Sequence, residues 1–358
     1  MQSLVMLGPA ASGRAPTARS LPVRNGRFTL ARADRCFFAP PPPEATGWPL
    51  APTGRPHGIR GSFNGVRGAA PHFGVDVEAV RNQAPVYAVA SGSVLRARQG
   101  AHRFSIGTLA NGHRLSYHHV VPVPTLHTNE PIDVGELVGH VVKGYYHVHV
   151  SEYTAACGWI NPMRSTGPLR IPQNTEAPTI GPLGAFVADS AAFRSFDPAE
   201  SPSREHDPAS PLSLSALHGV VDLRAEVHDW PVRAMTGKPQ LELEVAAIRA
   251  YLAPLSDRHA HLSRMKTIFD GATMLDPVRL GTTLWHIWAF GTWRDSTGYF
   301  QAGPFARSHL GAAYVWHVGG PHGLHTQLYP AGKYQYCVQA LTIEGVRGTR
   351  CTAVVIQH

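Results

Sequence analysis

The sequence predicts an all-β protein with largely antiparallel sheets, and three observations carry that prediction. Short runs rich in Val, Leu, Ile and Tyr recur at close spacing and are separated by turns that contain Gly or Asn. No amphipathic helical stripe of useful length interrupts these runs in the first half of the chain. The 35 Gly and 31 Pro residues, with only 16% charged residues, favour a turn-rich β protein over a helical bundle.

Four segments are expected along the chain. A length of 358 residues exceeds a typical single core, which predicts two domains. Residues 1–54 lack periodicity and contain a Pro-rich run, so we expect a partly disordered lead segment. The first β domain spans 55–170, a linker rich in Pro, Ser, Asp and Glu spans 171–212, and the second β domain spans 213–358.

The β-type runs predict strands in both domains. In the first domain they lie at 86–89, 93–95, 104–109, 114–120, 137–142 and 145–150. In the second domain they lie at 220–227, 241–245, 284–290 and 334–341, with a short helix expected around 259–269. Strands that pair and end in a tight closing hairpin predict a β-sandwich for this second domain.

Two motifs of the first domain carry side chains that bind metals. His147 and His149 stand two residues apart in a predicted strand, so both imidazoles project from the same face. The segment from His72 to Asp76 adds a further imidazole and a carboxylate. Zinc ligand atoms lie only about 3–3.5 Å apart, whereas a fully extended segment of this length spans about 13 Å. We therefore expect the chain to curl between His72 and Asp76, which Gly74 permits.

We expect His72, Asp76 and His149 to bind zinc, which leaves the fourth coordination position to water. Bound zinc lowers the pKa of such a water toward about 7, so hydroxide is available at neutral pH. His147 shares a strand face with His149 and is expected close to this water. Spacing alone also allows the reverse assignment, with His147 as the ligand and His149 as its neighbour.

A further strand is expected to contribute one histidine to the same cleft. His118 and His119 are adjacent in the sequence, and alternation along a strand points them to opposite faces, so only one of them reaches the cleft. Histidine titrates near pH ~6.5, so this residue and His147 can shuttle protons between water, the tetrahedral intermediate and the departing amine.

The spacing of the four cysteines does not fit a zinc ribbon, so we expect cross-linking, with free buried thiols as the alternative. Cys337 and Cys351 flank a turn-like segment and are expected to face each other in a hairpin. Cys36 and Cys157 remain without an assigned partner.

The charge distribution limits the class of partner. A net charge of +8 suits an anionic cell-wall or membrane surface. The cationic residues are scattered, without a Lys/Arg run interleaved with aromatic residues, so we expect no nucleic-acid partner. No run of about 18 apolar residues occurs, so no transmembrane segment is expected. No clear export signal is visible at the start of the chain.

Five motifs follow one another between residues 57 and 163. They are PHFGVDV at 71–77, APVYAVASGSV at 84–94, SYHHV at 116–120, GELVG at 135–139 and GWINP at 158–162. Together they resemble the lysostaphin-type (LytM-like) zinc metallopeptidases, which cut bacterial cell-wall peptides. That family usually has Leu between the paired histidines and an aromatic–acidic pair after them. This chain has Val148 and then Val150-Ser151-Glu152, so Glu152 stands one position later than the acidic residue of the family.

The resemblance implies that zinc is held by His72, Asp76 and His149, and it selects His119 over His118 as the partner of His147 in the non-ligand catalytic pair. It also implies a secreted or cell-envelope zinc endopeptidase that hydrolyses peptide bonds in peptidoglycan stems or cross-bridges. Two alternative functions stay open. One is a cell-envelope binding or regulatory protein with a slow or inactive metal site, and the other is a secreted metallopeptidase that acts on ordinary proteins.

The second domain carries a less distinctive likeness. Residues 329–340, YPAGKYQYCVQA, look like the late strand of immunoglobulin-like or fibronectin-like sandwiches, in which Pro-x-Gly-x-Tyr recurs. This likeness implies an immunoglobulin-like accessory β-sandwich.

Overall fold

The structure is a computed structural model that describes most of the chain from residue 47 onward. The described residues are 47–55, 57–65, 71–98, 105–110, 112–164, 167–169, 176–188, 211–229, 245–256, 266–271, 293–294, 312–313, 315–319, 323–343 and 345–358. Within these ranges the named strands all pair antiparallel, and the 3-10 helix η6, Thr326–Leu328, is the only helical element. The prediction of an all-β fold is therefore confirmed. No helix in the described part of the chain is long and apolar enough to cross a membrane.

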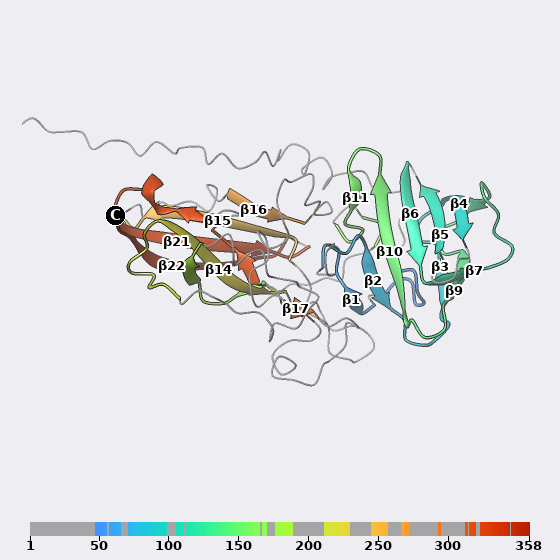
Figure 1. Cartoon of the computed structure of the whole chain (residues 1–358). Coiled ribbons are helices and arrows are strands. Elements are labelled where there is room, and N and C mark those ends of the chain that lie inside the picture. Colours follow the sequence, from blue (N-terminus) through green and yellow to red (C-terminus); the bar gives the residue numbers. More distant parts are fainter. Residues whose placement is uncertain are drawn as a thin grey trace, which may run out of the picture.

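The first half of the chain forms two sheets (Figure 1). The larger sheet runs in the order β1-β2-β10-β6-β5-β4-β8, with β11 paired to β10, and the smaller sheet runs β3-β9-β7. Their bounds are β1 Ile59–Gly61, β2 Val75–Glu78, β3 Pro85–Tyr87, β4 Gly92–Arg98, β5 Ser105–Ala110, β6 His113–His118, β7 Val120–Pro122, β8 Pro131–Ile132, β9 Leu137–Val141, β10 His147–Thr154 and β11 Gly158–Ile160.

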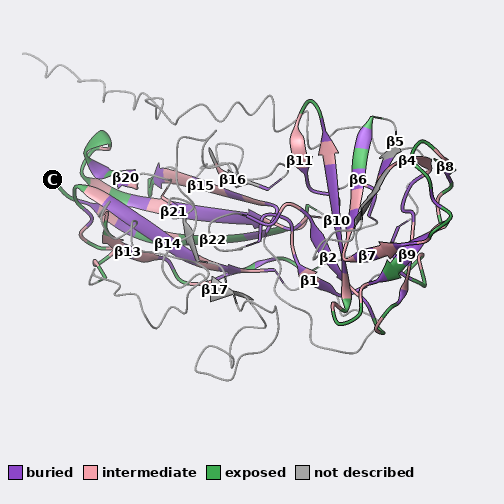
Figure 2. Cartoon of the chain, turned by 45° about the vertical axis from the view of Figure 1, so that its right-hand side comes forward, coloured by how far each residue is buried: buried purple, intermediate pink, exposed green. Residues whose placement is uncertain are grey.

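Strand β10 lies at the centre of the larger sheet. Its paired neighbours are β2, β6 and β11, and five of its residues in a row are buried (Figure 2). Val148 and Val150 alternate with His147 and His149, so one face of the strand packs into the hydrophobic core while the other carries the histidines. This apolar alternation fixes the register of β10, because a slip of one residue would exchange the two faces.

The packed core of the first half begins earlier than the expected boundary at residue 55. Trp48 and Leu50 are almost fully buried in it, and Leu50 bridges to Val86 of β3. The Pro-rich run that was assigned to the lead segment lies outside the described residues.

The second half contains two sheets around one core and a separate two-stranded sheet, β17-β18. A five-stranded sheet runs β12-β14-β13 with β19 and β20 also paired to β14, and a four-stranded sheet runs β16-β15-β21-β22. Buried residues of both sheets, among them Val221, Ile248 and Val338, belong to a single hydrophobic cluster, which is the arrangement of a β-sandwich. The bounds are β12 Thr179–Ile180, β13 Gly184–Val187, β14 Val220–His228, β15 Ala247–Pro254, β16 Lys266–Asp270, β17 Trp293–Arg294, β18 Ala312–Ala313, β19 Val315–His317, β20 Leu324–His325, β21 Gly332–Leu341 and β22 Arg347–Ile356.

Several elements of the second half differ from the expectations. The segment expected to be a linker contributes β12 and β13, which both pair with β14. Residues 266–269 of the expected short helix belong instead to the strand β16, because they pair with β15 in a sheet whose core they extend. The expected strand at 284–290 lies outside the described residues.

Cys337 and Cys351 stand directly opposite each other on β21 and β22 and form a disulfide, with their Cα atoms 4.1 Å apart. The expectation that they face each other in a hairpin is confirmed. Cys157 is also disulfide-bonded.

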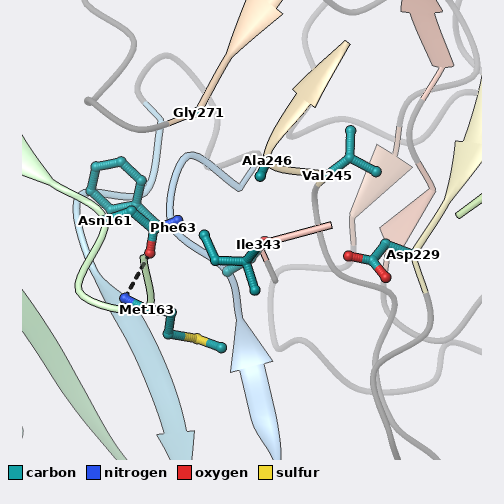
Figure 3. Close-up of a pocket in the computed structure, with 9 residues that line it drawn as sticks. Phe63, Asn161, Met163, Asp229, Val245, Ala246, Gly271 and Ile343 are labelled. Carbon is teal, nitrogen blue, oxygen red and sulfur yellow. Dashed lines mark hydrogen bonds between the residues drawn. The ribbon is translucent and has the colours of Figure 1, made fainter. Parts of the chain in front are cut away.

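The two halves contact each other at a small cavity (Figure 3). Phe63 and Met163 line it from the first half, and Val245, Ala246 and Ile343 line it from the second. The Ile343 side chain, in the turn between β21 and β22, packs against the hydrophobic core of the first half. Ser62, Asn161 and Asp229 add polar groups to the lining, so the two halves meet here through both apolar and polar side chains.

Candidate metal centre

Two neighbouring strands bring Asp76 and His149 together. Asp76 lies on β2, His149 lies on β10, and the two residues are direct partners in the antiparallel register. His72 lies in the irregular segment just before β2, so the chain reaches the same point from outside the sheet. All three residues are about 95% buried.

The three side chains converge on one point. His72 Nε2 is 2.8 Å from His149 Nδ1 and 3.2 Å from Asp76 Oδ1, and His149 Nδ1 is 3.1 Å from Asp76 Oδ1. Two sides of this triangle fall within the separation of about 3–3.5 Å that ligands of one tetrahedral zinc ion require, and the third, 2.8 Å between the two imidazole nitrogens, is slightly shorter. These three residues also form the single group of His, Cys, Asp and Glu side chains in the described part of the chain that is able to hold a metal ion.

A backbone carbonyl group fixes the tautomer of His72. Its Nδ1 lies 2.8 Å from the backbone carbonyl oxygen of Ser62, which accepts a hydrogen bond and so requires the proton on Nδ1. In the neutral imidazole, Nε2 then carries a lone pair that points toward Asp76 and His149. Holding the far nitrogen of a ligand histidine by a backbone carbonyl is typical of metal sites.

The orientation of His149 depends on the absence of a side chain at Gly74. A Cβ atom at Gly74 would lie 2.6 Å from His149 Nε2 and 2.5 Å from the carbonyl oxygen of Val150. The buried Nε2 has no hydrogen-bond partner among the described residues, and Nδ1 is the nitrogen that faces the cluster. The sequence argument assigned Gly74 to a curl of the chain, but the structural reason for glycine is this close approach.

We expect Gly74→Ala to weaken zinc binding by about 10- to 100-fold, because relief of the overlap costs roughly 1–3 kcal/mol and must displace either the His149 ring or the backbone of β10. Competition with a chromophoric chelator measures this affinity. Gly54→Ala is the matched control, because a Cβ there meets no atom within 4 Å. Unchanged zinc affinity in Gly74→Ala, with an unchanged melting temperature, would contradict the role of Gly74.

His147 stands beside the three converging residues. Its Nδ1 donates to the carbonyl oxygen of Tyr145 at 2.7 Å, which leaves the lone pair on Nε2, 3.9 Å from Asp76 Oδ1. Arg60 Nη1 donates to the same carbonyl at 3.1 Å and so holds this turn of the chain in place. Because His149 lies closer to Asp76 and directly contacts His72, the geometry favours His149 over His147 as the third ligand.

His119 reaches the cleft because its backbone leaves the strand conformation. Its φ of 62° lies in the left-handed region, between the end of β6 at His118 and the start of β7. The His119 ring centroid lies 4.8 Å from that of His147 and 6.5 Å from that of His149, and the ring stacks on Tyr145 at 4.2 Å.

The expectation that only one of the two adjacent histidines reaches the cleft is wrong. His118 is the direct partner of His149 in the register of β6 and β10, and the two ring centroids lie 5.0 Å apart. Alternation fails at this point because His119 has a positive φ, which turns its side chain toward the same side as that of His118.

Burial keeps His119 and His147 in their neutral form at neutral pH. Desolvation, together with the neighbouring imidazoles of His147 and His149, lowers the pKa of His119 to about 3. Desolvation also lowers the pKa of His147, although the carboxylate of Asp76 opposes this shift. Each ring therefore offers a lone pair beside the cluster.

Three supporting residues were missed by the sequence reasoning. Ser62 orients His72 through its carbonyl, Tyr145 holds His147 through its carbonyl and stacks on His119, and Arg60 donates to the Tyr145 carbonyl. Two of these contacts use backbone carbonyl groups, which every residue has. No residue-type signal in the sequence marks them.

The residues present fit zinc. Two imidazole nitrogens and one carboxylate oxygen are a donor set that zinc prefers, and a catalytic zinc site uses three protein ligands. In the absence of a cation, the lone pair of His72 Nε2 would face the acceptor oxygen of Asp76 at 3.2 Å. A shared cation removes that repulsion.

No protein-family model matches the sequence, and no curated protein matches it. Among solved structures, the chain is similar to Helicobacter pylori Csd3, with 22% identity over 35% of this chain and a TM-score of 0.27. It is similar to the catalytic domain of a mutant of the prophage-encoded M23 protein EnpA from Enterococcus faecalis, with 20% identity, 31% of this chain and 93% of that chain covered, and a TM-score of 0.26. It is also similar to lysostaphin, with 14% identity, 65% of this chain and 100% of that chain covered, and a TM-score of 0.28. This chain spans 34% of the length of the Csd3 chain.

Proposed function

We propose that this chain is a zinc-dependent endopeptidase that hydrolyses peptide bonds in the stems or cross-bridges of bacterial peptidoglycan. The convergence of His72, Asp76 and His149 within 3.2 Å of one another is the observation that carries the proposal. The choice of peptidoglycan as the substrate rests on the ordered motifs in the sequence and on the net charge of +8, which suits an anionic wall.

His72, Asp76 and His149 would hold the zinc ion, which would supply a bound water of lowered pKa and a Lewis acid for the carbonyl of the scissile bond. The Ser62 carbonyl orients His72. The His149 ring can take its position because Gly74 has no side chain there. The deep burial of the ligands excludes bulk water and strengthens their electrostatic effect on a substrate carbonyl.

His147 and His119 move protons beside the ligands. The His147 proton is held on Nδ1 by the Tyr145 carbonyl, so Nε2 is the atom that accepts or donates a proton at the reacting group. His119, stacked on Tyr145 and 4.8 Å from His147 between ring centroids, provides the second imidazole. One ring accepts the proton released by the attacking water and passes it to the leaving amine, and the other supports the developing oxyanion through its N–H group.

Zymography on purified cell walls tests the proposal. We expect the purified chain to clear the walls, a metal chelator to abolish clearing, and added zinc to restore it. A matched sample of the His147→Ala variant should take up zinc without clearing. Zinc uptake without clearing by the unaltered chain would instead support a binding or regulatory protein, and would overturn the proposed activity.

Analysis of the products by mass spectrometry tests the substrate. Cleavage within muropeptides supports a site of action in the cell envelope or outside the cell. Cleavage of unrelated proteins at a similar rate would contradict peptidoglycan specificity and support a general metallopeptidase.

A further inference from the structure

A row of aromatic side chains leads away from the candidate metal centre. The Phe73 ring centroid lies 4.6 Å from that of His149 and 5.1 Å from that of Trp159, and the Trp159 and Tyr153 centroids lie 5.2 Å apart. Phe73, Trp159 and Tyr153, which we term the aromatic ledge, are each only partly buried. Partly exposed aromatic rings in series offer flat apolar area for a bound chain.

The ledge lies on the same sheet face as the metal ligands. Tyr153 follows His149 by four residues on β10, so both side chains project from one face. Trp159 of β11 is the direct register partner of Tyr153. The face is therefore continuous from the ligands to the far end of β10.

Small polar side chains form the floor between the two ends of this face. Ser151 lies between His149 and Tyr153 on that face, and its register partner on β6 is Ser116. Ser151 is fully buried, and its Oγ has no hydrogen-bond partner among the described residues.

An exposed cation closes the far end of the ledge. Arg114 of β6 is the register partner of Tyr153, and its guanidinium lies 4.3 Å from the centroid of the Tyr153 ring. In the described part of the chain, no carboxylate pairs with Arg114. The stacking contact holds the guanidinium on the ledge and leaves its N–H donors available for an anion.

The spacing between the ligands and Arg114 sets the length of chain that spans it. Tyr153 is four positions after His149, which corresponds to about 13 Å along a strand. A bound extended peptide has nearly the same rise per residue as the strand, so about four of its residues span the distance from the metal ligands to Arg114.

We propose that the aromatic ledge and Arg114 form an extended subsite for the substrate peptide, with Arg114 binding a carboxylate about four residues from the scissile bond. This inference rests on the proposed function, because the metal centre defines where the scissile bond lies. The apolar rings contact the extended backbone and small side chains, and the guanidinium selects peptides that carry a negative charge at that distance.

Equilibrium binding to the full-length chain tests the subsite without turnover. The probes are N-terminally fluorescent alanine and glycine peptides of three, five and seven residues, each with a free carboxylate or a carboxamide, and a chelator is present throughout. We expect the five-residue carboxylate peptide to bind about fivefold or more tightly than its carboxamide, as for an exposed ion pair of about 1 kcal/mol. Arg114→Gln should remove this preference and Arg114→Lys should restore part of it.

Arg81→Gln is the matched control, because Arg81 is an exposed arginine beyond the opposite end of β10, where Glu78 pairs with His147. It should leave the carboxylate preference unchanged. In steady-state assays, Arg114→Gln should raise KM with little change in kcat.

The outcomes separate the subsite from the activity. A carboxylate preference that depends on Arg114, found together with no hydrolysis of cell walls, would keep the binding site and overturn the proposed function. Hydrolysis with equal binding of carboxylate and carboxamide peptides, or a preference that survives in Arg114→Gln, would overturn the subsite.

Discussion

The His149→Ala variant is expected to lose zinc binding, whereas His147→Ala is expected to keep zinc and lose turnover. His149 Nδ1 is one corner of the ligand triangle, 2.8 Å from His72 Nε2 and 3.1 Å from Asp76 Oδ1. Loss of a residue that only hydrogen-bonds to a metal ligand weakens metal binding by roughly 10- to 100-fold. Loss of His149, which is itself a ligand, should weaken zinc binding by more than that. His147 Nε2 is 3.9 Å from Asp76 Oδ1 and acts on protons, so its loss should lower turnover by about 10²- to 10⁴-fold.

Both variants should be measured in two assays: chelator competition for zinc affinity, and the rate of cell-wall clearing for turnover. Because the two histidines share one strand, one face and similar surroundings, each variant is the control for the other. Equal loss of zinc in the two variants would contradict the assignment of ligand and proton-transfer roles. If His149→Ala retained zinc and His147→Ala lost it, the two roles would be reversed.

The Arg164→Met variant is expected to destabilise the fold by about 3–5 kcal/mol, the cost of leaving a buried charge unpaired. Arg164 is fully buried and donates hydrogen bonds to both carboxylate oxygens of Glu152, which is also fully buried. It also donates to the carbonyl oxygen of Asn161 at 3.1 Å. His113 Nδ1 lies 2.5 Å from Glu152 Oε1, so the cluster joins β6, β10 and the segment after β11.

Urea unfolding followed by tryptophan fluorescence measures the effect. Arg55→Met, at an exposed position, is the matched control and should change the free energy of unfolding by less than about 0.5 kcal/mol. The double variant Glu152→Gln with Arg164→Met should recover much of the loss, because it removes both charges. A loss in Arg164→Met no larger than that in Arg55→Met would show that the buried pair contributes little to stability.

Glu152 belongs to this buried cluster and not to the metal ligands. Glu152 is three residues after His149, so alternation places the two side chains on opposite faces of β10. Glu152 therefore supports the core beneath the sheet and not the ligands directly. Ser151 takes the position on the face of the ligands.

Much of the architecture was predictable from the sequence because its signals are local. Apolar alternation and turn residues predicted strands that overlap β6, β9, β10, β14 and β21. The strand β15 and the pairing of residues 179–187 with β14 were not predicted. β12 and β13 have only two and four residues, and their partner β14 lies far away in the sequence, so no local pattern marks them.

The sequence by itself determined which residue types are present for metal chemistry, and that His147 and His149 share a strand face, because a strand repeats every two residues. The immunoglobulin-like character of the second domain stays a prediction. Only the tertiary structure decided which nitrogen of each imidazole faces Asp76, why residue 74 is glycine, and how His118 and His119 both reach the site. Those features depend on a carbonyl at Ser62, a backbone approach at Val150 and one positive φ, all of which arise when distant strands pack together.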